Sequence, residues 1–337
     1  MGRLAIGNIV FELTGACNQC CRFCYNYWRD GSTPIPAPDP RLARRTLRKL
    51  LSKAAVGTLS FSGGEPLLLR NVYDLVLSAR LKGSQVNVLT NGTLLDADAL
   101  GRLSDLGVGA IQIPILSASA AEHEYLTQRP GSWALATDAL KRASAALPGR
   151  TFAVLVLTRA NVSHIPACLE LIASLGVRGV MVNRFNLGGM GLRHAGELVL
   201  DRPALHAAFA QVEAFAATHP ALSFVSGVCT PLCFLSSADF PHIRFTSCST
   251  DFQRRPVTVN FGGDVRFCNH SPYVLGNLYE RPLADILADP ANLARYAALP
   301  DTCRQCKLLP RCGGGCRAAA EQVYGSFSHP DPVLDLV

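Results

Sequence analysis

The chain has 337 residues, of which 49% are hydrophobic and 17% are charged, and it carries a formal net charge of +7. This composition excludes disorder over most of the chain, and the length allows one large domain with a smaller one, or two of similar size. The N-terminus lacks the apolar stretch of a secretory signal, and the apolar run FAVLVL from Phe152 is far too short to cross a bilayer. We therefore expect a cytoplasmic protein that does not associate with membranes.

Six β-rich runs alternate with helical patterns in the first part of the chain. The runs are NIVFELT from Asn8, TLSFSGG from Thr58, QVNVLTNG from Gln85, AIQIPIL from Ala110, TFAVLVLT from Thr151 and GVMVNRF from Gly179. Strands that alternate with helices are typical of parallel βαβ units, and two of the helical patterns, over residues 94–106 and 163–175, are followed by glycine as helix C-termini are. The sequence therefore predicts an α/β fold with a partial (β/α)6 barrel of the TIM type. Its functional residues should follow the carboxyl ends of the strands.

The rest of the chain has a different composition. We expect the barrel to occupy residues 1–200, and a helical pattern from Asp201 to about Ser226 predicts a helical bridge over residues 201–247. Residues 248–337 combine cysteines with many glycines, prolines and short strands, which indicates a small metal-stapled module. The proline-rich segment 31–40 is either a plain connector or a stiff surface flap near the first cysteines.

Basic residues cluster on one predicted helix, at Arg41, Arg44, Arg45, Arg48 and Lys49. Such a cluster is most often a solvated helix face, and the alternatives are a site for an anionic substrate, an acidic peptide or a partner protein. No basic stripe is interleaved with aromatic residues in the way that single-strand binders require, so we do not expect a nucleic-acid partner.

Thirteen cysteines in a reducing compartment indicate metal binding or catalysis rather than disulfides. Cys17, Cys21 and Cys24 have the spacing C-x3-C-x2-C, which lets one loop present three thiolates to a cubane iron–sulfur cluster and leaves one iron open for a ligand. The alternatives are a zinc site or buried structural cysteines. Zinc would require a fourth ligand nearby, and the next seven residues contain none of the usual kind.

The segment LTGACNQCCRFCY resembles the cluster loop of the radical S-adenosylmethionine (radical SAM) enzymes. The resemblance implies that the open iron chelates the amino and carboxylate groups of S-adenosylmethionine. An electron from the cluster then cleaves this cofactor to a 5′-deoxyadenosyl radical. Phe23 occupies the aromatic position that packs near the adenine, whereas Cys20 falls outside the spacing and is interpreted as a bystander.

The segment FSGGEPL at residues 61–67 is similar to the GGE motif that follows the second strand in this family. Gly63 and Gly64 would allow close backbone approach to a ligand, and Glu65 would meet the amino group of the methionine moiety. The fourth strand departs from the family pattern Ser-Leu-Asp-Gly and reads IPILSAS around Ser117. The resemblance implies the cofactor-binding set Phe23, Ser62, Gly63, Gly64, Glu65, Asn91, Ser117, Asn161, Arg184 and Asn186.

The C-terminal cysteines resemble the SPASM extension of radical SAM enzymes, which holds two auxiliary iron–sulfur clusters. The motif is CRQCKLLPRCGGGC, which starts at Cys303. Upstream of it, Cys248 is followed by Gly263, and Cys268 comes after four further residues. The resemblance implies that the first auxiliary cluster takes Cys248, Cys268 and Cys316 with a fourth thiolate from Cys229 or Cys233. The second takes Cys303, Cys306 and Cys312.

The usual last cysteine of the SPASM pattern is absent, and Val333 stands in the expected place. We expect that His329, Asp331 or Asp335 substitutes for it, or that one iron stays open. Only one of Cys229 and Cys233 is needed for the first cluster. The other would be a buried thiol or, as an epimerase requires, a donor of a hydrogen atom. Cys168, on an apolar helix face, is interpreted as core packing.

The resemblance implies an enzyme that cleaves S-adenosylmethionine reductively and abstracts a hydrogen atom from its substrate, most often a ribosomally synthesised precursor peptide. The alternatives are a dehydrogenase, an epimerase or a tailoring enzyme acting on a small molecule such as an aminoglycoside sugar or a tetrapyrrole, and a non-catalytic iron–sulfur protein. Expected cofactors are a 4Fe–4S cluster that binds S-adenosylmethionine and one or two auxiliary 4Fe–4S clusters. Expected partners are the substrate and an electron donor such as flavodoxin or ferredoxin. Because the first strand is predicted to start near Asn8, we expect the leader of a peptide substrate to bind the barrel, the SPASM module or a separate leader-binding protein.

Overall fold

One continuous sheet organises the protein. The computed structural model describes residues 3–31, 34–249, 251–252 and 255–335. Within these residues the sheet has 11 strands in the order β11-β10-β9-β1-β2-β3-β4-β5-β6-β7-β8. The strands are β1 (Leu4–Thr14), β2 (Ala54–Gly63), β3 (Gln85–Leu89), β4 (Ala110–Pro114), β5 (Thr151–Leu157), β6 (Gly179–Arg184), β7 (Ser223–Ser226), β8 (Ile243–Phe245), β9 (Val257–Asn260), β10 (Asp264–Arg266) and β11 (Val274–Asn277).

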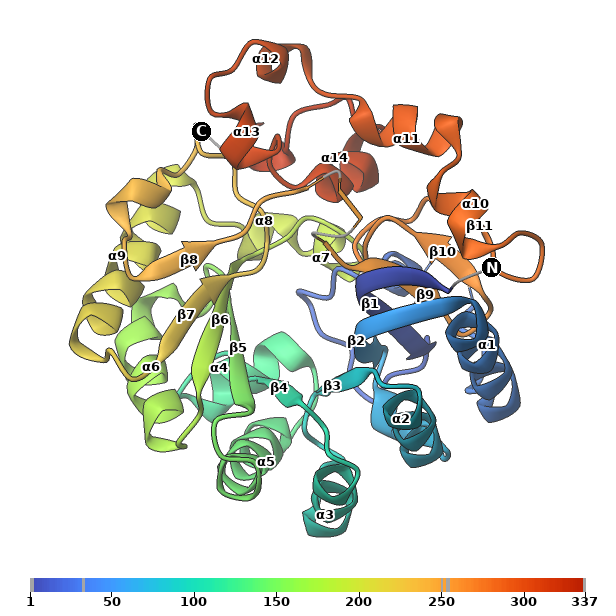
Figure 1. Cartoon of the computed structure of the whole chain (residues 1–337). Coiled ribbons are helices and arrows are strands. Elements are labelled where there is room, and N and C mark those ends of the chain that lie inside the picture. Colours follow the sequence, from blue (N-terminus) through green and yellow to red (C-terminus); the bar gives the residue numbers. More distant parts are fainter. Residues whose placement is uncertain (1–2, 32–33, 250, 253–254, 336–337) are drawn as a thin grey trace.

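Neighbouring strands from β9 to β8 pair in parallel, and helices cover the outer face of the curved sheet (Figure 1). The helices are α1 (Pro40–Lys53), α2 (Val72–Leu81), α3 (Ala97–Asp105), α4 (Ala120–Thr127), α5 (Ser132–Ala146), α6 (Ile165–Ser174), α7 (Met190–Arg193), α8 (Ala195–Leu198), α9 (Arg202–Thr218), α10 (Leu283–Leu287), α11 (Pro290–Ala297), α12 (Asp301–Arg304), α13 (Leu309–Cys312) and α14 (Arg317–Tyr324). In the part of the chain that the structure describes, no helix combines the length and the apolarity needed to span a membrane. The six predicted strands and the partial barrel are confirmed.

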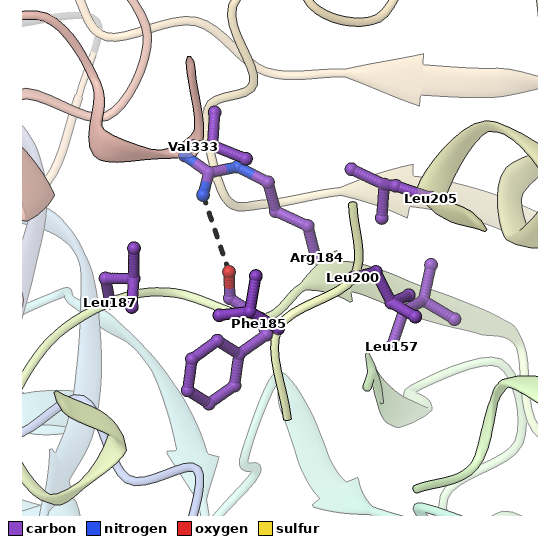
Figure 2. Close-up of a pocket in the computed structure, with 8 residues that line it drawn as sticks. Leu157, Arg184, Phe185, Leu187, Leu200, Leu205 and Val333 are labelled. Atoms are coloured by element: carbon purple, nitrogen blue, oxygen red, sulfur yellow. Dashed lines mark hydrogen bonds between the residues drawn. The ribbon is translucent and has the colours of Figure 1, made fainter. Parts of the chain in front are cut away.

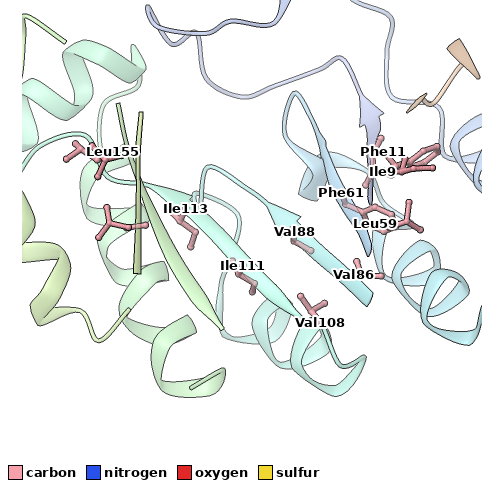
Figure 3. Close-up of a cluster of buried hydrophobic side chains, with 14 of the residues drawn as sticks. Ile9, Phe11, Leu59, Phe61, Val86, Val88, Val108, Ile111, Ile113 and Leu155 are labelled. Carbon is pink, nitrogen blue, oxygen red and sulfur yellow. The ribbon is translucent and has the colours of Figure 1, made fainter. Parts of the chain in front are cut away.

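The main core lies between the sheet and the outer helices (Figure 3). Alternate residues of the strands, among them Phe11, Phe61, Val88 and Ile113, point into it and are fully buried. This alternation follows from the two-residue repeat of a β-strand, and it explains why the β-rich runs of the sequence become strands. Cys168 is buried in the same core, as predicted.

Helix α1 begins where the proline-rich segment ends. The carboxylate of Asp39 accepts hydrogen bonds from the backbone N–H groups of Arg41 and Leu42, both at 3.0 Å, and Pro40 occupies the first helical turn, where its missing N–H has no cost. Residues 32 and 33 of the predicted flap lie outside the described residues. Ile35 nevertheless lies beside the loop that follows β1, because a Cβ atom added to Gly15 would lie 3.1 Å from its Cγ2 atom.

The sheet extends further in both directions than the sequence indicated. The helical pattern predicted as far as Ser226 ends at Thr218, because Ser223–Ser226 forms strand β7 and pairs with β6. At the other edge, residues 257–260 of β9 pair with residues 9–12 of β1, so that β1 is not an open edge. The domain boundaries at residues 200 and 248 stay predictions. Strands on both sides of each boundary belong to the same sheet.

A buried ion pair links the barrel to the C-terminal part of the chain. The guanidinium of Arg266, at the end of β10, donates to the carboxylate of Glu12 in β1 and to the carbonyl oxygen of Ser271 at 2.7 Å. Arg266 is fully buried and Glu12 is 3% exposed. Burial raises the pKa of Glu12, and the Arg266 charge opposes that rise. Each charge therefore depends on the other for its compensation inside the protein.

We expect Arg266→Leu to lower the free energy of unfolding by about 3–5 kcal/mol, because it leaves the Glu12 carboxylate buried without its cation. The exposed pair Arg102–Asp98, at 3.1 Å, provides the control, and Arg102→Ala should cost less than about 1 kcal/mol. Urea unfolding followed by circular dichroism measures both. Equal losses in the two variants would contradict a special role for the buried pair.

Candidate functional site

Three cysteine side chains gather in the loop that follows β1. Cys17, Cys21 and Cys24, here called the barrel cysteines, are partly buried free thiols. Burial first, and then the charges of the other two, raise the pKa of Cys21 well above the usual thiol value. Burial also raises the pKa of Cys17, and it raises that of Cys24 to about 11. The three sulfur atoms are therefore close enough to repel one another as thiolates, and a bound cation would relieve that repulsion.

Arg29 brings positive charge to this loop. Its guanidinium donates to the carbonyl oxygen of Gln19 at 2.5 Å, and the side-chain oxygen of Gln19 accepts from the Cys21 thiol at 3.2 Å. Against the larger effect of burial, the Arg29 charge lowers the pKa of each barrel cysteine. Sequence analysis missed Arg29 and Gln19, because neither stands at a position of the cysteine spacing.

The end of β2 packs directly against the cysteine loop. The backbone N–H of Gly64 donates to the carbonyl oxygen of Thr14 at 2.8 Å, and that of Glu65 donates to the carbonyl oxygen of Ala16 at 2.9 Å. A Cβ atom added to Gly64 would lie 2.0 Å from the Ala16 oxygen, and Gly63 has a φ of +123°. The two glycines of the GGE motif therefore allow the backbone to approach the loop that carries the thiols. Their predicted approach to a ligand stays a prediction.

Glu65 connects the loops that follow β2 and β3. One carboxylate oxygen accepts from the hydroxyl of Thr90 at 2.7 Å and from the N–H of Leu67 at 3.0 Å, and the other accepts from the N–H of Asn91 at 2.7 Å. Glu65 is fully buried; burial raises its pKa and these hydrogen bonds oppose the rise. Its carboxylate thus has three partners within the protein, and the predicted contact with an amino group stays a prediction.

Asn91 reaches back to the cysteine loop. Its side-chain N–H groups donate to the side-chain oxygen of Asn18 at 2.7 Å and to the Cys17 sulfur at 3.9 Å. Asn18 in turn donates to the hydroxyl of Thr93 at 2.9 Å. The loops after β1, β2 and β3 therefore form one hydrogen-bonded unit around the barrel cysteines. Asn18 was also missed by sequence analysis, and its position between two barrel cysteines is the signal that would have found it.

Ser117 and Asn161 lie deeper, and their polar atoms have partners within the protein. The Ser117 hydroxyl donates to the carboxylate of Glu122 at 2.5 Å and accepts from the N–H of Ser119 at 3.0 Å. Asn161 donates to the carbonyl oxygens of Leu116 at 2.7 Å and Val156 at 2.8 Å. Both side chains hold the loops after β4 and β5 in place. Their cofactor contacts remain predictions.

Arg184, at the end of β6, points toward the C-terminal segment. Its guanidinium donates to the carboxylate of Asp331 at 2.5 Å and to the carbonyl oxygens of Cys229 at 2.9 Å and Phe185 at 3.4 Å. Figure 2 shows Val333 beside this guanidinium, in a small pocket that Phe185 also lines. Arg184 is 2% exposed and thus connects the barrel to the C-terminus from the inside. Its predicted contact with a cofactor stays a prediction.

Asn186 has an unused hydrogen-bond acceptor. Its amide nitrogen donates to Nδ1 of His270 at 2.6 Å, and desolvation, followed by the charges of Arg184 and Arg266, lowers the pKa of His270 to about 3. The imidazole is therefore neutral and accepts at that nitrogen. The side-chain oxygen of Asn186 is buried and lacks a hydrogen-bond partner among the described residues. A buried acceptor of this kind fits a bound group that donates a hydrogen bond.

Two further predicted residues flank the cysteine loop. Phe23 is partly buried against an apolar cluster that includes Leu116, Phe185 and Leu187. Ser62 is buried in β2, where it pairs with Glu12 of β1. Phe23 lies beside a barrel cysteine in sequence, so its ring can form one apolar side of the site.

Four other cysteines form a second group, here called the inner thiol set: Cys229, Cys248, Cys268 and Cys316. The neighbouring Cys248 thiol and burial raise the pKa of Cys229, and Cys229 in turn lowers the pKa of Cys248. Cys229 and Cys268 also pack against a small buried cluster that consists of Cys316, Ala318 and Ala319. Of the two candidates for the fourth thiol, the structure therefore places Cys229 with the other three.

The remaining SPASM-like cysteines form the outer thiol set, which consists of Cys233, Cys303, Cys306 and Cys312. All four are partly or largely exposed. The backbone N–H of Leu232 donates to the Cys312 sulfur at 3.4 Å. Cys233 follows Leu232 directly in the chain, so its backbone lies close to Cys312.

Two buried arginines next to the inner thiol set have nitrogens without a hydrogen-bond partner among the described residues. Arg255 is 7% exposed and Arg317 is 2% exposed, and neither forms an ion pair with an acidic side chain of the described residues. Three of their N–H-bearing nitrogens, Nε and Nη2 of Arg255 and Nε of Arg317, have no partner there. Both charges help to lower the pKa of Cys248, after the hydrogen bond from Cys229. Uncompensated buried cations fit a bound group whose thiolates carry net negative charge.

The donors of the three sets bear on the kind of group that they would hold. Among the described residues, no three His, Cys, Asp or Glu side chains converge closely enough to hold one metal ion. Each set consists of three or four thiols, and thiolates are the usual ligands of iron–sulfur clusters. The donor chemistry of the three sets therefore fits an iron–sulfur cluster.

We expect Gly64→Ala to displace the cysteine loop, because the added methyl group would lie 2.0 Å from the Ala16 oxygen. The unfolding midpoint should fall, with a loss of about 2 kcal/mol or more, and the barrel cysteines should react faster with iodoacetamide. Gly101→Ala in α3 is the matched control, because nothing lies within 4 Å of its added Cβ atom. That variant should be neutral or stabilising by up to about 1 kcal/mol. A neutral Gly64→Ala would contradict the close contact.

Comparison with known proteins assigns the two parts of the chain. Residues 11–172 match the radical SAM superfamily, and residues 248–307 match the SPASM iron–sulfur cluster-binding domain. PqqA peptide cyclase of Xanthomonas campestris pv. campestris (strain 8004) is 28% identical over 97% of this chain and 86% of the relative. PqqA peptide cyclase of Gluconobacter oxydans (strain 621H) is also 28% identical, over 98% of this chain and 90% of the relative.

Solved structures share the fold at low sequence identity. Streptococcus suis SuiB bound to precursor peptide SuiA has a TM-score of 0.73 at 16% identity, covering 98% of this chain and 75% of that one. Native anSMEcpe with bound AdoMet and Cp18Cys peptide has a TM-score of 0.70 at 15% identity, covering 99% and 94%. These matches confirm the predicted fold. The chain therefore belongs to the radical SAM superfamily and is a radical SAM enzyme with a C-terminal SPASM iron–sulfur cluster-binding domain.

Proposed function

We propose that this enzyme modifies a ribosomally synthesised precursor peptide by radical chemistry. The observation that carries the proposal is the loop of three free thiols that backbone hydrogen bonds hold against the loops after β2 and β3. The relatives that match nearly the whole chain are named as peptide cyclases, and two structures of the same fold contain bound peptides. These names support a peptide as the substrate.

In the proposed site Cys17, Cys21 and Cys24 would hold a 4Fe–4S cluster as thiolates. A bound cluster with S-adenosylmethionine would supply the electron and the 5′-deoxyadenosyl radical. Burial disfavours free thiolates here, so the positive charge of iron, assisted by Arg29, would stabilise them. Three thiolates would leave one coordination position of the cluster for S-adenosylmethionine.

The residues around the loop position the cofactor and exclude water. Asn91 holds Cys17 and Asn18 in place from the loop after β3. The unpartnered oxygen of Asn186 accepts a hydrogen bond from the nucleoside, and Phe23 provides an apolar wall beside the adenine. An enclosed, apolar surrounding protects a carbon radical from solvent and oxygen.

The SPASM domain carries two auxiliary 4Fe–4S clusters in the proposed enzyme, one at each thiol set. A flavodoxin or ferredoxin supplies electrons, and a separate protein can present the leader of the peptide. The side chains of Arg41, Arg44 and Arg48 on α1 are exposed and suit an acidic leader. Arg45 is left out of this set, because its guanidinium packs on the ring of Tyr279, 4.7 Å from the ring centre.

A small anionic substrate is the second candidate function, and the same basic face of α1 favours it. A non-catalytic iron–sulfur protein is disfavoured, because a purely structural site would be closed by a fourth ligand at the barrel cysteines.

The anaerobically reconstituted protein, given dithionite and S-adenosylmethionine, should release 5′-deoxyadenosine, measured by liquid chromatography. Cys24→Ala should reduce the release by at least about 10³-fold, because the cluster loses one of its three ligands. Cys20→Ala is the matched control from the same loop and should retain activity, since Cys20 lies outside the spacing and is exposed. No product from the unaltered protein would favour the non-catalytic class.

Incubation with a candidate precursor peptide should change the mass of that peptide, as measured by mass spectrometry. The change should require S-adenosylmethionine and disappear in Cys24→Ala, because it depends on the radical. Arg41→Glu combined with Arg44→Glu should weaken modification of an acidic-leader peptide by about tenfold while 5′-deoxyadenosine release without peptide is kept. An unshifted peptide mass, with a small anionic substrate converted instead, would refute the peptide assignment.

A further inference from the structure

We propose that Cys233 is the fourth ligand of the second auxiliary cluster, completing the outer thiol set with Cys303, Cys306 and Cys312. The inference rests on the proposed function only in requiring that the SPASM domain binds clusters at its thiol sets. It replaces the sequence-based expectation of a non-cysteine ligand or an open iron. Each thiol loses its proton and donates an electron pair to iron, so the step involves no oxidation.

The glycine run between Cys312 and Cys316 separates the two thiol sets. Gly313, Gly314 and Gly315 all have positive φ values, of +68°, +86° and +78°. Three successive left-handed residues reverse the chain, and only glycine adopts them without strain. Cys312 ends α13 before this turn, and Cys316 precedes α14 after it. Cys312 and Cys316 are therefore separated along the chain by a sharp turn.

The segment of Cys233 packs against this turn. A Cβ atom added to Gly315 would lie 2.7 Å from Cγ of Pro231, so Pro231 lies directly on the glycine backbone. A Cβ atom added to Gly313 would lie 2.4 Å from the carbonyl oxygen of Cys248. The turn therefore contacts both the segment that leads to Cys233 and the segment that carries Cys248.

A tight turn presents Cys233 toward Cys312. The N–H groups of Phe234 and Leu235 donate to the carbonyl oxygen of Pro231 at 2.9 and 3.0 Å, and both apolar side chains are 2% exposed. Cys233 is exposed between these anchors and the Leu232 N–H that donates to the Cys312 sulfur at 3.4 Å. The backbone on both sides of Cys233 is therefore fixed at the outer thiol set.

The other candidates for the fourth ligand already have partners. Asp331 is 1% exposed, pairs with Arg184 and accepts from the N–H of Cys316 at 2.6 Å. Asp335 accepts from the hydroxyl of Tyr324, and the His329 ring lies 5.0 Å from the ring of the same tyrosine. Val333, in the place of the usual last cysteine, is buried beside Arg184 (Figure 2).

One consequence concerns the spare thiol expected from the sequence. If Cys229 belongs to the inner thiol set and Cys233 to the outer one, neither is free to donate a hydrogen atom. The thiol mechanism of an epimerase would then require another donor.

Differential alkylation tests the assignment in the full chain without altering it. The protein is reconstituted anaerobically with iron and sulfide, treated with iodoacetamide, and mapped by peptide mass spectrometry beside a chelator-stripped sample. Cys233 should be labelled at least about tenfold less in the reconstituted protein, because a thiolate bound to iron does not react. Exposed Cys20 is the internal control and should be labelled equally in both samples. Labelling of Cys233 in the reconstituted protein would overturn the proposal.

Iron content provides a second measurement that does not involve activity. In a chain whose barrel cysteines are all changed to alanine, two auxiliary clusters should give about eight irons, and Cys233→Ala should reduce this to about four after challenge with a chelator. Cys20→Ala should keep the full content. Iron loss in His329→Ala or Asp335→Asn but not in Cys233→Ala would assign the ligand elsewhere. A chain that takes up only one auxiliary cluster would also contradict the proposal.

Neither measurement uses S-adenosylmethionine. A protein that protects Cys233 but releases no 5′-deoxyadenosine would retain this inference and refute the proposed function. A protein that releases 5′-deoxyadenosine but has Cys233 labelled would support the proposed function and refute this inference.

Discussion

The site depends on one close contact between backbones, in which the glycines after β2 lie against the loop after β1. The loop after β1 carries the three barrel cysteines. The bonds from Gly64 to Thr14 and from Glu65 to Ala16 attach it to the carboxyl end of a buried strand. Any side chain at Gly64 would prevent that approach. The position of the cysteine loop therefore depends on a glycine at residue 64.

Charge compensation is the second theme of the structure. Eleven cysteines gather in three sets, and for nearly all those with a shifted pKa the dominant effect is that burial disfavours the thiolate. Arg29 faces one set, whereas Arg255 and Arg317 lie beside another with nitrogens that have no partner in the described part of the chain. Such an arrangement is costly when the sites contain only protons. In the proposed enzyme, iron bound to the sulfur atoms and a cluster anion facing the arginines would make it favourable, so we expect metal binding to be strongly coupled to folding.

The barrel and the SPASM domain act as one framework because the sheet runs through both. β9 pairs with β1, the strand that leads into the cysteine loop, and the Arg266–Glu12 pair crosses the same junction. On the opposite side, Arg184 at the end of β6 pairs with Asp331. The thiol sets are therefore held at a fixed separation from the barrel cysteines. A fixed separation suits electron transfer and the positioning of a substrate between the sites.

The sequence alone determined the barrel strands, the barrel cysteines and the presence of two further cysteine groups, because these depend on local periodicity and spacing. It also pointed to Asn91 and Asn186, but not to Arg29, Gln19 or Asn18. Only the tertiary structure decided that Glu65 has partners within the protein, that β7 follows α9, and that Cys229 packs beside Cys316 whereas Leu232, next to Cys233, contacts Cys312. These facts depend on contacts between segments far apart in the chain. Spacing in a sequence limits which thiols can meet, whereas the fold decides which of them do.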